Sequence, residues 1–190
     1  MGRDRDPFDR TMDALRQRLE AAGPLQGRPL AINALASQLG VSQTPVREVL
    51  ARLAGEGLVV RTPSGYAGIT YDAARVVELY DLCRLLVLTG LARGAPPTAE
   101  GDEGAFSLLR RIVATGGPVL GEAFDRAQGA LAPLQVAEMR ICGGDDLAGR
   151  LIVEGLRTGA AEAARAVRRH YGRRIARSRE ILAAALLSES

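Results

Sequence analysis

Two runs of apolar residues with helical spacing lie close together in the N-terminal third of the chain. Apolar side chains recur every three or four positions over residues 32–39 and again over residues 46–53, which is the pattern of one buried helix face. Residues 58–61 and 66–70 read as two short strands joined by a Thr-Pro-Ser-Gly turn. The pattern therefore predicts two short helices followed by a two-stranded ribbon.

Polar residues, glycine and proline indicate where these helices begin and end. Asn33 is expected to cap the first helix, and Gly40 to end it, because glycine tolerates the backbone conformation that terminates helices. Ser42 or Thr44 can cap the second helix, and Pro45 fits its first turn, where a missing N–H costs nothing. Two helices joined by so short a turn suit the crossed helix-turn-helix rather than a parallel bundle.

The second of these helices begins with polar side chains that could read DNA. Ser42, Gln43, Thr44 and Arg47 lie off its apolar face, and arginine can pair with guanine or a phosphate while glutamine can pair with adenine. Gly65 in the ribbon would let the backbone approach a phosphate or the minor groove. The alternative is a small helical domain without a DNA role. The order of helix, tight turn, second helix and ribbon favours a DNA-binding winged helix-turn-helix.

The segment LGVSQTPVREVLARLAGEGLVVRTPSGY resembles the winged helix of GntR-family bacterial transcription regulators, which typically read LGVSRTPVREAL, then RL and EGLV. The resemblance implies a homodimer on a double-stranded operator with two half-sites. It assigns the DNA contacts to Asn33, Ser42, Gln43, Thr44, Arg47 and Gly65. The chain departs from the family at Gln43, where arginine is usual, and at Ile32, where an acid is usual, so lower affinity or different preferred bases are expected.

Helical spacing continues through the rest of the chain and suggests two domains. Apolar positions between Phe8 and Leu19 predict a first helix ending near residue 22, which completes a DNA-binding domain over residues 1–71. Residues 72–190 predict an all-helical bundle, so the fold class is mainly α. The family resemblance implies that this bundle binds an effector and dimerises. The expected segments are a long helix capped by Asp72, a loop over 94–104, and helices over 105–114, 120–141 with a kink at Pro133, 147–156 and 160–187.

Composition agrees with a helical, nucleic-acid-binding protein. Of the 190 residues 47% are hydrophobic but only 4% are aromatic, so the core is aliphatic, and the net charge of +3 suits a nucleic-acid partner. Neither a signal peptide nor a membrane-length apolar stretch is found, which predicts a cytoplasmic protein without membrane association. Cys83 and Cys142 are expected to be buried small side chains. Because a nucleophile elbow, a P-loop and a dinucleotide fingerprint are all missing, an enzyme and a bound cofactor are not expected.

The second half resembles the helical effector-binding domain of the FadR-like GntR subfamily, through VVELYDLCRLLVLTGLARGA, FSLLRRIVATGGPVLGEAF and GLRTGAAEAARAVRRHY. Many members bind a divalent metal there through one Asp and three His. In this chain the resemblance assigns those positions to Glu103, Ser107, residues 148–150, which contain no histidine, and His170. One histidine and one glutamate are too few for tight binding, so no metal site is predicted. The usual Arg and Glu of the opening helix are replaced by Cys83 and Val87.

The last predicted helix carries a charged residue on its inner face. On a helical wheel Arg174 lies within the apolar stripe that runs from Val167 to Ala185, and His170 lies beside it. An inward arginine needs a partner. One hypothesis is that His170 and Arg174 bind an anionic small-molecule effector; the alternative is that Arg174 pairs with Glu103, Glu122 or another acid.

Two functions remain open at this point. The first is a ligand-responsive transcription regulator, a repressor by family habit, whose effector changes the spacing of two winged domains. The second is a constitutive DNA- or partner-binding protein whose helical domain has lost its sensing role. The short helical domain and the missing metal ligands favour the second, and the inward Arg174 favours the first.

Overall fold

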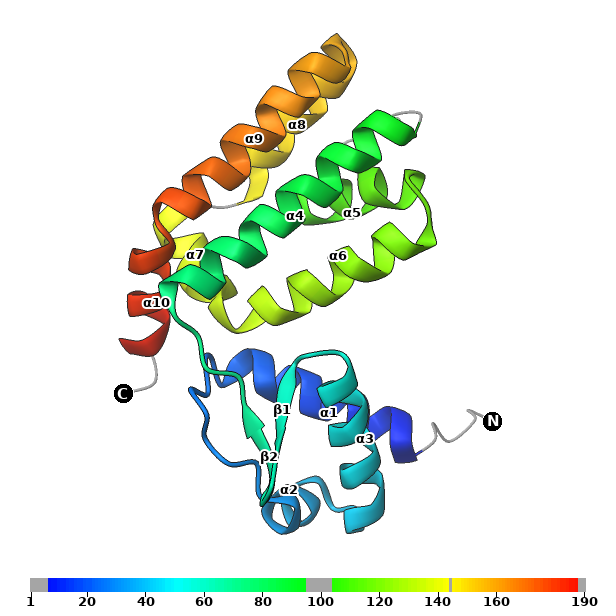
Figure 1. Ribbon diagram of the computed structural model, residues 1–190, viewed down its shortest axis with the longest axis vertical. Helices are drawn as coiled ribbons and strands as arrows, with labels where there is room; N and C mark the ends of the chain where they lie inside the picture. The colour runs from blue at the N-terminus through cyan, green and yellow to red at the C-terminus, as the bar shows by residue number, and fades with distance from the viewer. Residues whose placement is uncertain (1–6, 95–103, 144, 188–190) are drawn as a thin grey trace. The chain divides into compact units, whose positions relative to one another are not determined.

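The computed structural model describes residues 7–94, 104–143 and 145–187. They form two compact units, one running up to Tyr71 and the other from Asp72 to Ala185. The fold is mainly α, and the only strands in the described residues form one small two-stranded sheet (Figure 1). The sequence prediction of a winged helix-turn-helix followed by a helical domain is confirmed.

The first unit consists of three helices and a short ribbon. Its elements are α1 (Pro7–Ala21), α2 (Ile32–Leu39), α3 (Gln43–Gly55), β1 (Val59–Thr62) and β2 (Gly65–Gly68). The strands pair antiparallel with Val59 opposite Gly68 and Thr62 opposite Gly65. An isolated bridge between Pro29 and Ala67 attaches the segment before α2 to the ribbon, which fixes the ribbon beside the helices.

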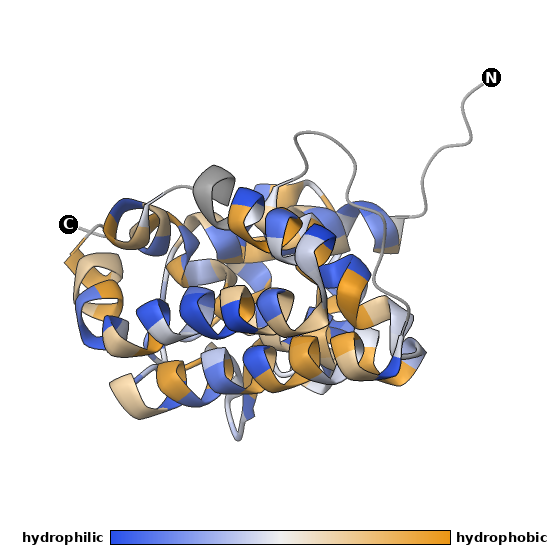
Figure 2. Ribbon diagram, turned by 90° about the horizontal axis from the view of Figure 1, so that it is seen from above, coloured by the Kyte–Doolittle hydropathy of each residue, from blue (hydrophilic) through white to orange (hydrophobic). Residues whose placement is uncertain are grey.

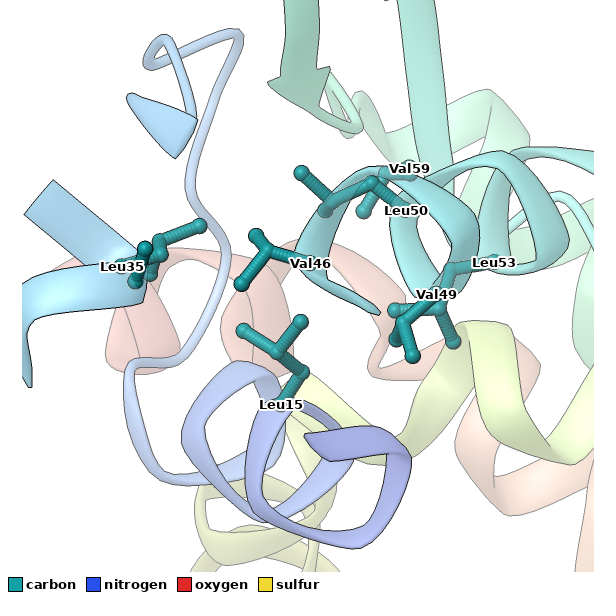
Figure 3. Packing of buried hydrophobic residues seen from close by; sticks show 8 residues of the cluster. Leu15, Leu35, Val46, Val49, Leu50, Leu53 and Val59 are labelled. Atoms are coloured by element: carbon teal, nitrogen blue, oxygen red, sulfur yellow. The ribbon is translucent and has the colours of Figure 1, made fainter. Parts of the chain in front are cut away.

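The core of the first unit is built from the apolar positions that the helical spacing singled out. Figure 3 shows side chains from α1, α2, α3 and β1 pointing into one cluster. The fully or nearly fully buried members are Leu15, Leu35, Ala36, Val46, Val49, Leu50, Leu53 and Val59. Burial of aliphatic side chains stabilises by about 1.5–3 kcal/mol each, so α3 is held mainly by this packing.

The helix ends agree with the prediction in part. Gly40 ends α2 in the left-handed conformation with φ of +64°, and its N–H reaches back to the last turn. Asn33 does not cap α2, because Ala31 occupies that position and Asn33 lies inside the first turn. Ser42 precedes α3, but its side chain makes no capping hydrogen bond, and Thr44 lies within the helix. Both helices therefore depend on packing rather than on side-chain caps.

The second unit is a bundle of helices arranged around α4. The elements are α4 (Ala73–Arg93), α5 (Ala105–Thr115), α6 (Pro118–Leu131), the 3-10 turn η1 (Ala132–Leu134), α7 (Gln135–Cys142), α8 (Asp145–Thr158), α9 (Ala160–Ala176) and α10 (Ser178–Leu187). Helix α4 packs against α5, α6 and α9. Hydrophobic and hydrophilic positions alternate along the helices, as amphipathic packing requires (Figure 2). Asp72 caps α4 as predicted, because its side chain accepts from the Arg75 N–H.

Two predicted helices are each divided in the structure. The segment 120–141 breaks at η1, where Pro133 lacks the N–H that a continuing helix needs. The segment 160–187 breaks at Arg177, whose φ of −106° and ψ of 12° are not helical, and Figure 1 shows α10 turned away from α9. Glycine and proline are both absent at this second break, so spacing alone could not reveal it. Most of the predicted loop over 94–104 lies outside the described residues.

Candidate nucleic-acid interface and buried polar cluster

The polar side chains that were predicted to contact DNA are exposed on helix α3 and just before it. Ser42, Gln43, Thr44 and Arg47 are all exposed, while Val46 and Val49 on the opposite side are fully buried. Asn33 is also exposed, on the first turn of α2. Because the polar side is exposed and the apolar side is buried, the first two turns of α3 can enter a major groove.

A groove of about 470 Å³ lies between α3 and the ribbon. Arg47 and Arg61 contribute cationic groups to it, and Gly65 and Tyr66 contribute the ribbon side. Gly65 has φ of +134°, a conformation that favours glycine, and a Cβ there would meet no atom within 4 Å. Glycine is therefore required at this turn by its backbone conformation and not by crowding. The cationic lining suits a phosphate backbone that passes between helix and ribbon.

A second groove, of about 520 Å³, lies at the start of α3. Ser42, Thr44 and Glu48 of the α3 region line it together with Phe8 and Arg10 of α1. Glu48 therefore borders both grooves. An exposed carboxylate repels phosphates but can accept a hydrogen bond from a cytosine amino group, so Glu48 and Arg61 join the candidate contacts that the sequence reading missed.

The substitution at Gln43 affects Arg47 one turn later. The Arg47 Nη2 atom donates to the Gln43 side-chain oxygen over 3.3 Å. An arginine at position 43 would instead place two cations four residues apart on one helix face, which is a repulsive spacing. Gln43 therefore positions the Arg47 guanidinium while giving up one charge.

A charged bridge holds α1 against the far end of α3. The Glu56 carboxylate accepts from Arg16 of α1 at 2.5 Å and from Arg52 of α3 at 2.8 Å. Both arginines are largely exposed, so each pair contributes at most about 1 kcal/mol. The bridge lies at the other end of α3 from Gln43, which leaves the reading end unobstructed.

The second unit contains a buried cluster of polar groups around Arg174. The Arg174 Nε donates to a Glu138 oxygen at 2.6 Å, and the Tyr80 hydroxyl donates to the other Glu138 oxygen at 2.7 Å. The Arg174 Nη1 also lies 3.2 Å from the His170 Nδ1 and from the His170 carbonyl oxygen. The cluster joins α4, α7 and α9. Arg174 therefore pairs with an acid, Glu138, that the sequence analysis did not name.

The environment of this cluster shifts the pKa values of His170 and Tyr80. Burial, and then the Arg174 charge, lower the pKa of His170 to about 3, so the ring is neutral at physiological pH. Burial raises the pKa of Tyr80, and the adjacent Glu138 charge adds to the effect. The hydroxyl thus stays a donor and the imidazole stays uncharged, while Glu138 balances the Arg174 charge.

The wheel prediction for α9 and α10 is confirmed. The apolar stripe from Val167 to Ala185, including Arg174, is buried. Four other arginines of α9 are exposed, namely Arg165, Arg168, Arg169 and Arg173. Glu103 lies outside the described residues, and Glu122 forms an exposed pair with Arg126. Cys83 and Cys142 are buried free thiols as predicted, and burial raises the pKa of Cys83 to about 12.

Of the positions related to the family's metal ligands, Ser107 and His170 are described by the structure, and they lie on different helices. Ser107 is exposed on α5, and His170 belongs to the Arg174 cluster on α9. Within the described residues, three or more His, Cys, Asp or Glu side chains nowhere gather as they would around a metal ion. A tightly held divalent metal needs such a group, and the absence of a metal site stays a prediction.

Helix-turn-helix, recognition-helix exposure and ribbon together define the class of the first unit as a winged-helix DNA-binding protein. Residues 7–65 match the model of the bacterial regulatory proteins of the gntR family. This segment is therefore a DNA-binding segment of the gntR type, as found in bacterial transcription regulators.

Solved structures with the same fold extend over both units. E. coli McbR/YncC matches with a TM-score of 0.63 at 16% identity, covering 90% of this chain and 96% of that one. Lar, which controls the expression of the Listeria monocytogenes agr system, matches with a TM-score of 0.50 at 16% identity, covering 98% and 99%. A comparison with curated protein sequences gave no match. Along the described residues, every helix is too short or too polar to cross a membrane.

Proposed function

We propose that the chain is a homodimeric regulator of the FadR-like type that binds a two-half-site operator in the cytoplasm and represses transcription. The observation that carries the proposal is the exposed polar start of α3 beside a cationic groove and ribbon. Two half-sites multiply the affinity of one small module, since a single winged helix makes few phosphate contacts.

The exposed residues have different roles in this proposal. Gln43, Thr44 and Arg47 lie where a recognition helix contacts base edges, so they set sequence preference. Asn33, Ser42 and the Gly65 backbone lie at the margins and position the phosphates. Arg61 in the ribbon adds a phosphate contact across the groove from Arg47.

Fluorescence anisotropy on DNA from just upstream of the chain's own gene tests the proposal. Wild type should bind a palindromic segment far more tightly than scrambled DNA. Arg47→Ala should lose roughly 5- to 150-fold of that preference, the range for one base-reading side chain at about 1–3 kcal/mol. Arg126→Ala on α6, an exposed arginine of the second unit, is the control for the loss of one charge. Equal binding of both DNAs by wild type would contradict the proposal.

The regulator is further proposed to respond to a small anion at His170 and Arg174. Supporting this, the guanidinium and the imidazole lie 3.2 Å apart within the helical unit. Glu138 supports the second candidate function, a constitutive binder, because its carboxylate already accepts from Arg174 at 2.6 Å. An anionic effector would therefore have to displace Glu138 and rearrange α7.

The two candidates give opposite results in one titration. Mono- and dicarboxylates added to the protein–operator complex should release the DNA if Arg174 accepts an external anion. Arg174→Met should abolish that response while DNA binding without the anion persists. If every carboxylate leaves the anisotropy unchanged at concentrations up to about 10 mM, where a ligand of millimolar affinity would be bound, the constitutive binder is the correct function.

A further inference from the structure

Helix α4 exposes an apolar stripe on the side away from the bundle. Leu82 is 43% exposed and Leu85 is 54% exposed. Thr89 continues the stripe, and its hydroxyl donates to the Leu85 carbonyl over 2.8 Å, so this polar group is satisfied within the helix. Two leucines exposed next to each other on one helix face differ from the isolated apolar residues normal on surfaces.

The stripe lies opposite the side of α4 that packs into the bundle. The buried residues of α4 are Val76, Tyr80, Cys83, Val87, Gly90 and Leu91. At 100° per residue, the direction of Leu82 and Leu85 lies roughly 150° from the mean direction of that buried set. Helices α5, α6 and α9 pack against α4, yet they leave this stripe exposed.

Opposite charges lie at the two ends of the stripe. Glu78 precedes Leu82 by four residues and Arg93 follows Thr89 by four, which keeps all of them on one face. Both charged side chains are exposed. The midpoint between Glu78 and Arg93 falls beside Leu85, so the stripe has an acidic end, an apolar middle and a basic end.

We propose that a second copy of this chain covers the stripe by antiparallel pairing of α4 with α4, an inference that rests on the homodimer of the proposed function. A two-fold axis beside Leu85 places Glu78 against the partner's Arg93, and by symmetry this contact forms twice. The leucines then pack together between the two charge contacts. Parallel pairing would instead bring like charges together, so the charge order selects the antiparallel arrangement.

The extent of the stripe determines how strong the association is. From Glu78 to Arg93 it runs for about 22 Å, at a rise of about 1.5 Å per residue. A contact between two single helices of that length falls at or below the roughly 1,200 Å² at which specific interfaces begin, so the free dimer is weak. Arg75 lies beyond the paired length, because its symmetry-related position falls after the end of α4 at Arg93.

Sedimentation velocity on the full chain, over roughly 1–200 μM, tests the pairing in the range expected for a small interface. The variants are Glu78→Arg, Arg93→Glu and the two together. Each single reversal should weaken association about tenfold or more, because it creates two like-charge contacts, and the double reversal should restore it. The same reversals at Glu122 and Arg126, an exposed pair on α6, should leave association unchanged.

A second pair of variants tests the apolar part of the contact. Leu85→Asp should abolish the dimer, and Val119→Asp, at a position 77% exposed on α6, should not. Far-UV circular dichroism confirms that each variant is folded, which is expected because both positions are exposed.

The outcomes separate this pairing from the proposed function. A wild-type dimer that is indifferent to all these changes overturns α4 pairing and leaves the homodimer in place through another surface. A chain that remains monomeric at every concentration overturns the pairing too, and operator anisotropy then decides separately whether specific DNA binding stands. Single reversals that weaken the dimer without recovery in the double reversal overturn the antiparallel arrangement.

Discussion

Removal of the Glu138 carboxylate is the perturbation that most directly tests the buried cluster. The Arg174 side chain is 6% exposed and the Glu138 side chain 17% exposed, with 2.6 Å between Nε and Oε1. In Glu138→Ala the guanidinium loses this carboxylate while it remains buried, and the Tyr80 hydroxyl loses the oxygen to which it donates. Both changes destabilise the folded state, because desolvation is no longer offset by a charge-assisted hydrogen bond.

The expected size follows from burial. Breaking a buried ion pair by removing one partner costs about 3–5 kcal/mol. Because Glu138 is partly accessible to water, we expect about 3 kcal/mol, which corresponds to a fall in the melting temperature of about 10 °C for a unit of this size. Glu122→Ala is the matched control, since its pair with Arg126 is 60–68% exposed at 3.5 Å, and it should cost less than about 0.5 kcal/mol.

The assay is differential scanning calorimetry of the full chain, with urea unfolding followed by circular dichroism. Calorimetry is needed because the two units can unfold in separate transitions. Arg174→Met and the Glu138→Ala/Arg174→Met double variant complete a cycle, and the coupling between the two sites should exceed about 1.5 kcal/mol. A cost below about 1 kcal/mol for Glu138→Ala, or single costs that simply add in the double variant, would refute the reasoning.

Three further changes have definite expected outcomes. Between about pH 7 and pH 5 the wild type should lose about 2 kcal/mol more stability than His170→Gln. The unfolded histidine gains a proton below its ordinary pKa of about 6.5, while the folded one, with a pKa of about 3, does not. An equal loss of unfolding free energy in the two proteins, measured by urea unfolding at both pH values, would contradict this. Gly90→Ala should cost about 1–3 kcal/mol, because its Cβ would lie 2.4 Å from the Ile112 carbonyl oxygen, whereas Gly121→Ala, with open space around it, should stabilise by about 0.5–1 kcal/mol; both are measured by calorimetry. Tyr80→Phe removes the hydroxyl that donates to Glu138 and should lower the free energy of unfolding by about 1 kcal/mol, and an unchanged calorimetric transition would count against that hydrogen bond.

The first unit could be predicted closely because its signals are local. Helical spacing, Gly40 and the Thr-Pro-Ser-Gly turn act within a few residues, and the observed α2 covers the predicted apolar run and ends before Gly40 as predicted. The caps could not be predicted, because packing of the leucines and valines stabilises α2 and α3 without a side-chain hydrogen bond at either start.

The partner of Arg174 was beyond the sequence for a different reason. The helical wheel correctly predicted that Arg174 faces inward, but Glu138 lies 36 residues earlier on another helix. The 3-10 turn at Pro133 separates α6 from α7, so the inward direction of α7 cannot be extended from the apolar positions of α6. Arg61 was missed for a similar reason, because only the folded ribbon brings it beside α3.

Helix α4 contributes to both the buried polar cluster around Arg174 and the exposed apolar stripe. Tyr80 points inward to Glu138, and Leu82 and Leu85 are exposed on the other side. A ligand that displaced Glu138 would release Tyr80 from its acceptor and so act on the same helix that the proposed second copy contacts. Such a ligand could alter pairing only if its affinity differed between the paired and unpaired states, and pairing would then alter ligand affinity by the same factor. The dimer dissociation constant of Glu138→Ala therefore tests whether the cluster is coupled to pairing: a constant equal to that of the wild type would mean that the cluster stabilises the bundle without influencing how two copies meet.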